Sequence, residues 1–300
     1  MAIAETLSCA AITSFIWAYG NRRALDRKMA AKRLQGLKMC HQMLKLVGIV
    51  QQHRGMVGAT LNGDNGFTLK IQERQQEADA LLMHIAKGLN QRLGFFRANG
   101  WTHIEQRWEA IKSDWQSWDP WDSFEAHTQL IALQLDLMAE ISERSGLGML
   151  SAQADNQLVA YALKLIPLML ESTGQTRALG VGVSVRQHCD VPTRLRLLFL
   201  RQRLAQGQDR VRQQFLGLSK EAKERLDQVW QEQEGGRKTS ELFAIVSEQF
   251  LGHSGIRVEP NSFFNCATAV IEANLAVADE AMRILQGHLQ AQTHSRLAVH

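Results

Sequence analysis

Arginines that directly precede small residues are the side chains of this sequence best suited to chemistry. Arg54 stands in "QQHRGMVGATLNGDNG" (51–66), and Arg177 stands in "GQTRALGVG" (174–182). Glycine in a helix interior costs about 1 kcal/mol relative to alanine. Its repeated use therefore indicates that a neighbouring helix approaches closely, and that the arginine beside it is drawn into a narrow gap between helices.

Two such arginines on separate helices could together bind an anion. Two guanidinium groups repel each other strongly in a low-dielectric interior. An anion placed between them would remove that repulsion. The alternative is that each arginine simply pairs with a Glu or Asp from another helix.

Nothing in the sequence predicts catalysis, a cofactor or a metal site, so we expect a protein that is not an enzyme. The ten histidines include no HExxH pattern, and no GxSxG nucleophile pattern occurs. The glycines of "GVGVSV" (180–185) lie in a predicted helix, whereas a phosphate-binding loop follows a strand. The four cysteines are scattered without a CxxC pair, which predicts reduced thiols in a cytoplasmic setting.

Length and composition predict an ordered globular chain. The 300 residues are 45% hydrophobic and 21% charged, with only four prolines, a composition that excludes a disordered chain. The net charge of +4 is too small to indicate a nucleic-acid partner, which is therefore not expected. One helix is strongly basic, and we predict a solvated face paired with acidic neighbours, with anionic lipid or nucleic acid as the alternative partner: Arg194, Arg196, Arg201, Arg203, Arg210 and Arg212.

The N-terminal segment, residues 1–34, is predicted to be a unit of its own. Its apolar stretch, Leu7 to Gly20, is shorter than the roughly 20 residues that span a bilayer comfortably, and a basic stretch follows it. One interpretation is an amphipathic first helix packed on the body of the protein. The other is a short membrane anchor, whose basic flank would keep the folded part on the cytoplasmic side of the inner membrane.

The remainder of the chain is predicted to be helical almost throughout. The turn "NGDNG" (62–66) is expected to end the first long helix, and "RANG" (97–100) the second. Tryptophans at a heptad spacing, with isoleucines three positions later, indicate a helix seam packed in the core: Trp101, Trp108, Trp115, Ile104, Ile111 and Trp118. Asp119-Pro120 ends this pattern, and Asp122 with Glu125 resembles an N-cap with its partner.

The second half of the chain shows similar helix punctuation. We expect a long helix from about Asp155 to Cys189 with a kink at Pro167, followed by a helix that begins near Pro192. "EGGRKTS" (234–240) is predicted to be a flexible joint, and "GHSGIRVEPNS" (252–262) a loop whose Asn261 or Ser262 caps the final helix. The predicted fold is all-α, two packed antiparallel helical bundles of roughly eight helices, with a tail at 293–300.

Three segments of the sequence resemble the nitrate- and nitrite-sensing (NIT) domain of bacterial signalling proteins. "QQHRGMVGATLNGDNGFTLKIQERQQEADALL" is similar to the first helix of that family, with a basic residue and small residues that lead to a turn. "LIPLMLESTGQTRALGVGV" is similar to its central helix, with a Gly-Gln-x-Arg-x-x-Gly core. "FFNCATAVIEANL" is similar to its closing helix, and the resemblance covers roughly residues 40–290.

The resemblance implies a sensor domain over residues 35–292, formed by two four-helix bundles. It implies that nitrate or nitrite binds between the first and a central helix, held by Arg54 and Arg177. Some family members carry two consecutive arginines in the first helix, and His53 takes the place of the first of them here. Because a neutral imidazole attracts an anion less than its cation does, His53 could make binding pH-dependent.

The chemistry of the two partners suits this interpretation. Nitrate is planar and singly charged, and guanidinium offers it a rigid planar fork of donors. A helix shift on binding would signal to a separate output protein, and the chain could also form a homodimer. The competing interpretation is a helical scaffold or protein-interaction module that has kept this fold and lost the anion.

Overall fold

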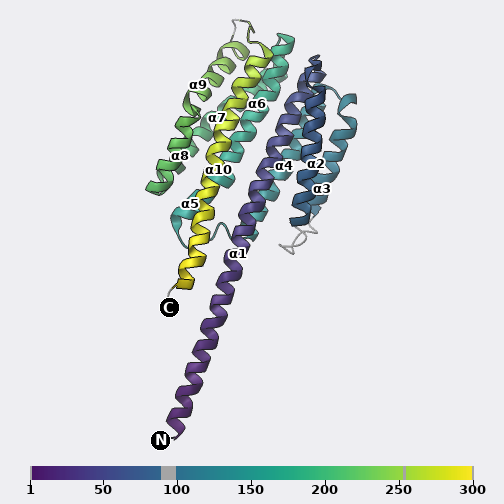
Figure 1. Cartoon of the computed structure of the whole chain (residues 1–300). Helices are drawn as coiled ribbons and strands as arrows, with labels where there is room; N and C mark the ends of the chain where they lie inside the picture. Colours follow the sequence, from purple (N-terminus) through teal and green to yellow (C-terminus); the bar gives the residue numbers. More distant parts are fainter. Residues whose placement is uncertain (1, 89–98, 253–254, 299–300) are drawn as a thin grey trace.

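The chain folds into helices and the short segments that connect them in the part that the structure describes. This structure is a computed structural model, and it describes residues 2–88, 99–252 and 255–298. The predicted all-α class is confirmed, because helices follow one another along the described chain without an intervening strand. The helices form two groups that lie side by side (Figure 1).

The first group contains the first four helices, which pack as one bundle around α1. They are α1 (Ala2–Leu61), α2 (Thr68–Gly88), α3 (Asn99–Asp114) and α4 (Pro120–Arg144). The turn predicted at residues 62–66 does end α1. Residues 97 and 98 lie outside the described residues, whereas Asn99 and Gly100 begin α3, so the predicted helix end at 97–100 is wrong at its last two positions.

The second group contains the remaining helices, packed around α10. They are α5 (Gln153–Ala160), α6 (Ile166–Arg186), α7 (Val191–Leu216), α8 (Lys220–Glu232), α9 (Gly235–Ile245) and α10 (Pro260–Ala298). Wider π-helical turns join α5 to α6 (Tyr161–Leu165) and extend α9 (Val246–Phe250). Helices α8 and α9 follow one another along α10 (Figure 1). The two groups meet where α1 packs against α6 and α10.

The caps show where local sequence determines helix ends. Asp119, rather than the predicted Asp122, caps α4, and its carboxylate accepts hydrogen bonds from the backbone of Trp121 and Asp122. Pro120 then fits the first turn, where a missing N–H has no cost. Residues 235–240, predicted as a joint, form the first turns of α9. Asn261 and Ser262 lie inside α10 rather than capping it.

The tryptophan seam forms core, as the heptad spacing predicts. Trp101, Trp108 and Trp115 are all at least nine-tenths buried, and Ile104 and Ile111 are fully buried beside them. Helix α3 ends at Asp114, so Trp115 sits in a 3-10 turn that still faces the core. These side chains pack α3 onto the rest of the first bundle.

The predicted kink at Pro167 takes the form of a π-helical segment. Proline cannot donate a backbone hydrogen bond, and its ring clashes with the carbonyl four residues earlier. The wider turn over Tyr161–Leu165 lies one turn before Pro167, where it gives that carbonyl room. The chain thus continues from α5 into α6 without a loop.

Helix α1 is unbroken across the predicted boundary at residues 34 and 35. Its N-terminal part extends beyond the bundles (Figure 1), and from residue 24 onward, where exposure is described, Gly36 is the first buried position. Among the described residues, no helix is both long enough and apolar enough to cross a membrane. At the other end, α10 continues to Ala298 through most of the predicted tail. The division of the chain at residues 34 and 292 stays a prediction.

Gly174 and Gly180 of α6 differ from Gly58 of α1 in how closely other atoms approach them. A Cβ on Gly174 would lie 2.9 Å from an η nitrogen of Arg54, and one on Gly180 would overlap the ring of Phe263. A Cβ on Gly58, by contrast, would meet nothing within 4 Å. The close approach predicted from sequence therefore holds for α6, where side chains rather than a neighbouring backbone fill the space.

Alanine substitutions should separate these two kinds of glycine. We expect Gly58→Ala to raise the free energy of unfolding by up to about 1 kcal/mol, because alanine is the better helix former and the site is open. Gly180→Ala should lower it by about 1–3 kcal/mol, because Phe263 would have to move. Urea unfolding of both variants tests this, and equal changes in both would contradict it.

Candidate functional site

Helix α1 presents two different faces near residue 54. Gln51, Arg54 and Gly55 have the spacing that places side chains on one face of a helix, and this face meets α6. His53 is one position away, about 100° around the helix, and faces α2 and α4 instead. Neighbouring residues of the same motif therefore enter separate interfaces.

Arg54 is buried and forms an ion pair with Glu171 of α6. One η nitrogen lies 2.7 Å from Glu171 Oε1 and the other lies 3.2 Å from Oε2, so the pair is bidentate. The guanidinium also donates to Thr128 Oγ1 at 3.1 Å, and its central carbon lies 5.5 Å from the centre of the Phe124 ring. For Arg54, the structure thus shows the predicted alternative of pairing with an acidic residue on another helix.

Arg177 is equally buried, with 1% of its surface exposed, but has neutral partners. Its η nitrogens donate to the backbone carbonyl of Gln51 at 3.0 Å and to Thr268 Oγ1 at 2.9 Å. Its guanidinium lies over the ring of Phe264, 5.1 Å from the centroid. Within the described part of the chain, no carboxylate lies within ion-pairing distance of Arg177.

The pKa of Arg177 is below its ordinary value, because the guanidinium is buried without a carboxylate partner among the described residues. The pKa is lowered to about 10, mainly by burial and then by the charge of Arg54, while Glu171 and Glu272 act in the opposite direction. Arg177 donates to the backbone carbonyl of Gln51, one turn before Arg54 on α1, and Arg54 pairs with Glu171 of α6, so both guanidinium groups lie between the same two helices. The predicted convergence of the two arginines in one interface is therefore found.

Glu171 is the centre of the polar network between α1 and α6. Besides Arg54, it accepts hydrogen bonds from Gln51 Nε2 and from Gln175 Nε2, both at 2.8 Å. Gln175 in turn accepts from Arg196 of α7 at 3.1 Å. The buried part of the cluster holds two guanidinium groups and one carboxylate, so it carries a net charge of +1.

Several donors of this cluster are left without acceptors. Nε of Arg54, Nε of Arg177 and Nε of Arg196 are buried and have no hydrogen-bond partner among the described residues. An unsatisfied buried donor costs about 1–3 kcal/mol, and more when the group is charged. The cluster thus combines excess positive charge with unused N–H groups, which are the properties of an anion-binding site.

Sequence analysis did not identify Glu171, Gln51 or Gln175. The signal was present, since "ESTGQTR" (171–177) is a polar stretch within an otherwise apolar helix. Glu171, Gly174 and Gln175 have a spacing that places them on one helix face. A polar stripe in a buried helix must find partners, and Arg54 provides one.

His53 is buried but does not belong to the arginine cluster. Its Nδ1 lies 2.8 Å from His127 Nε2, and its Nε2 lies 3.1 Å from Gln75 Nε2. Nδ1 of His127 lies 2.6 Å from the carbonyl oxygen of Ser123, so it must donate there. This order fixes the chain of donors, in which Gln75 donates to His53 and His53 donates to His127.

Both histidines are held in the neutral form by their surroundings. Burial lowers the pKa of His53 to about 4. The pKa of His127 is also well below its ordinary value, first because of burial and then because of the charge of His53. His53 is therefore neutral between pH 6 and pH 8, and the pH-dependent binding expected of it is not supported.

The basic helix predicted from sequence is α7, and its arginines fall into two sets. Arg194 and Arg196 are half-buried, and Arg194 donates to the carbonyls of Leu251 and Gly252. The remaining four are exposed. Over the residues that the structure describes, no carboxylate forms an ion pair with any of the six, so the predicted acidic partners are not found. No group of three metal-binding side chains occurs in that same part of the chain.

Comparison with protein families identifies the family of this chain. A family model described as nitrate and nitrite sensing matches residues 45–286, which include both arginines and the glutamate that joins the two helices. The chain therefore belongs to the nitrate and nitrite sensing family, and the resemblance seen in the sequence is confirmed. Neither the curated proteins nor the solved structures contain a match.

The neutral histidine pair leads to a prediction about pH. In the unfolded chain, His53 takes up a proton near pH 6.5, whereas in the folded protein its pKa is about 4. The free energy of unfolding is then highest above pH 6.5 and falls as the pH decreases towards 4, by about 3 kcal/mol from His53 alone. His53→Gln should remove that contribution in urea unfolding between pH 7.5 and pH 4.5.

His84 provides the matched control, because it is exposed on α2. His84→Gln should keep the pH dependence of the parent protein. An unchanged slope in His53→Gln would show that His53 is protonated in the folded state.

Proposed function

We propose that the chain binds one nitrate or nitrite ion between α1 and α6, at Arg54 and Arg177. The observation that supports this most is the buried guanidinium of Arg177, which has no carboxylate partner in the described part of the chain and lies near a second guanidinium. A monovalent anion would neutralise the net charge of +1. A divalent anion would leave a buried negative charge, at a high desolvation cost.

The shape of the donors also favours a small planar oxyanion. A guanidinium group donates through N–H groups that lie in one plane, and nitrate accepts through oxygens that lie in one plane. The unused Nε groups of Arg54 and Arg177 are available for such contacts. Two or three charge-assisted bonds, at about 1.5–3 kcal/mol each, would support micromolar affinity after ordering and desolvation costs.

Glu171 supplies a mechanism for the switch. Its carboxylate already forms a planar, bidentate pair with Arg54, so it competes with a nitrate ion for the same donors. An ion that displaces it would weaken the contact between Arg54 of α1 and Glu171 of α6 and strengthen the contact between the two arginines. The relative position of the two helices would then depend on the ligand, which is what a sensor requires.

The signal would pass without catalysis to a separate output protein, and a second copy of the chain is a further candidate partner. A cytoplasmic location with a membrane tether through residues 1–34 belongs to the same proposal.

One observation favours a different function. Because Glu171 can itself satisfy Arg54, the cluster could persist without an ion, as in a helical scaffold or protein-interaction module that no longer senses an anion.

Direct binding measurements separate the sensor from the scaffold. We expect millimolar nitrate or nitrite, but not equal chloride or phosphate, to raise the melting temperature, because only a ligand of the native state does so by mass action. Arg177→Gln and Arg54→Gln should each lose the shift and the calorimetric binding signal. Arg203→Gln, an exposed change on α7, should keep both. Binding unchanged in both buried variants would contradict the assignment.

Glu171→Gln tests the competition between carboxylate and ion. Without ligand, this variant should be less stable than the parent by about 3–5 kcal/mol, because Arg54 loses its buried partner. Its nitrate affinity should rise at least tenfold, because the charge of the cluster increases and the competitor is gone. Calorimetry on both proteins measures this. In a scaffold without a ligand site, nitrate would stabilise neither.

A further inference from the structure

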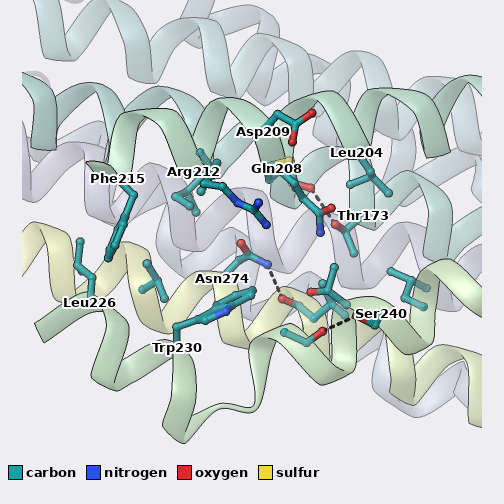
Figure 2. A pocket seen from close by; sticks show the side chains of 18 of the residues that line it. Thr173, Leu204, Gln208, Asp209, Arg212, Phe215, Leu226, Trp230, Ser240 and Asn274 are labelled. Atoms are coloured by element: carbon teal, nitrogen blue, oxygen red, sulfur yellow. Dashed lines mark hydrogen bonds between the residues drawn. The ribbon is translucent and has the colours of Figure 1, made fainter. Parts of the chain in front are cut away.

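A cavity lies inside the second bundle, and its lining includes neither Arg54, Arg177 nor Glu171. It has a volume of about 680 Å³ and is enclosed by α6, α7, α8, α9 and α10 (Figure 2). This volume falls in the range of small-molecule sites, about 300–1,000 Å³. None of the residues assigned above to nitrate lines it.

One wall of the cavity is aromatic and held in place. Trp230 of α8 and Phe215 of α7 both line it, together with aliphatic side chains such as Leu204 and Leu226. The backbone of Gly235 packs so closely on the indole of Trp230 that a Cβ there would overlap it. This contact keeps the indole in one orientation, so the wall is formed before any ligand arrives.

Polar side chains of α9 and α10 also line the cavity. Thr239 of α9 is 7% exposed, and its Oγ1 is buried without a hydrogen-bond partner among the described residues. Asn274 of α10 gives its amide N–H to the carbonyl of Val270 at 2.8 Å, and its own carbonyl oxygen is turned towards the cavity (Figure 2). A buried hydroxyl without a partner requires an explanation, and a ligand in the cavity would provide one.

The charged side chains at the mouth of the cavity come from α7 and α8. The guanidinium of Arg212 reaches in over Asn274, whereas the carboxylate of Asp209 is directed away (Figure 2). Asp227 of α8 also lines the mouth, and both it and Arg212 are exposed, so water screens both charges. Arg212 is singled out by its direction, because its guanidinium reaches in over Asn274 (Figure 2).

We propose that this cavity binds a flat aromatic molecule that carries a single carboxylate or sulfonate group. The aromatic body lies against Trp230 and Phe215, the anionic group meets Arg212, and Thr239 donates its unused hydroxyl proton. Aromatic stacking supplies contact area, and the guanidinium fixes the orientation of the ligand. Small-molecule sites commonly combine apolar contact with a few polar groups in this way. The site is independent of nitrate, since the two share no side chain.

Two fluorescent probes of the same aromatic type test the proposal. The first is 1-anilinonaphthalene-8-sulfonate, which is anionic, and the second is N-phenyl-1-naphthylamine, which has no charge. We expect saturable binding of the anionic probe to the folded full-length chain with one molecule per chain, and at least tenfold weaker binding of the neutral one. Non-saturable fluorescence, or equal affinity for the two probes, would overturn the proposal.

Substitutions then assign the binding to this cavity. Arg212→Gln should weaken the anionic probe about tenfold and leave the neutral probe unchanged, whereas the matched control Arg203→Gln should change neither. Thr239→Val keeps the shape of the side chain and removes its hydroxyl. It should raise the melting temperature of the free protein, because an unsatisfied polar group is lost, and it should weaken the anionic probe.

Nitrate provides the last control. A saturating concentration of nitrate should leave the probe bound, whether or not nitrate itself binds at Arg54 and Arg177. Displacement of the probe by nitrate, or an Arg212→Gln variant that binds the anionic probe as tightly as the parent does, would show that the cavity is not the site.

Discussion

The interface between α1 and α6 buries two guanidinium groups, Arg54 and Arg177, but only the carboxylate of Glu171 pairs with one of them, Arg54. Glu171 has no spare capacity, since it already accepts from Arg54, Gln51 and Gln175. Arg177 relies on a backbone carbonyl and a hydroxyl, which are weaker partners for a charge. The interface is therefore held by groups that a small anion could rearrange, while an apolar cluster that includes Ala59 of α1 and Ala178 and Leu179 of α6 keeps the helices in contact.

Much of the fold could be predicted from the sequence because helix ends are marked by local chemistry. Three signals each determine a helix end that lies within a few residues of them: the glycine turn after α1, Asp119-Pro120 before α4 and Pro192 in α7. Gly235 shows the limit of such reasoning. Its neighbours suggest a joint, but the contact with Trp230 makes it the start of a packed helix, and tertiary packing overrides propensity.

The candidate site was predicted only in part, for a geometric reason. Arg54 and Arg177 each stand beside small residues, which indicated a shared interface between helices, and the structure places both side chains there. His53 was grouped with Arg54 because it takes the place of the first of two consecutive arginines in some family members, although consecutive helical residues point about 100° apart. Glu171 was missed because its ion-pair partner Arg54 is 117 positions away in the sequence. The polar stripe in α6 indicated that Glu171 needed a partner, but not which residue that partner was.

The uninterrupted course of α1 gives a small movement a distant effect. From Arg54 to Ala2 the helix has no break, a span of about 80 Å at 1.5 Å per residue. Its outer part leaves the bundles and has few neighbours to restrain it (Figure 1). A tilt of a few degrees near the buried cations would therefore swing the opposite tip through several ångströms, so the length of the helix would amplify the displacement.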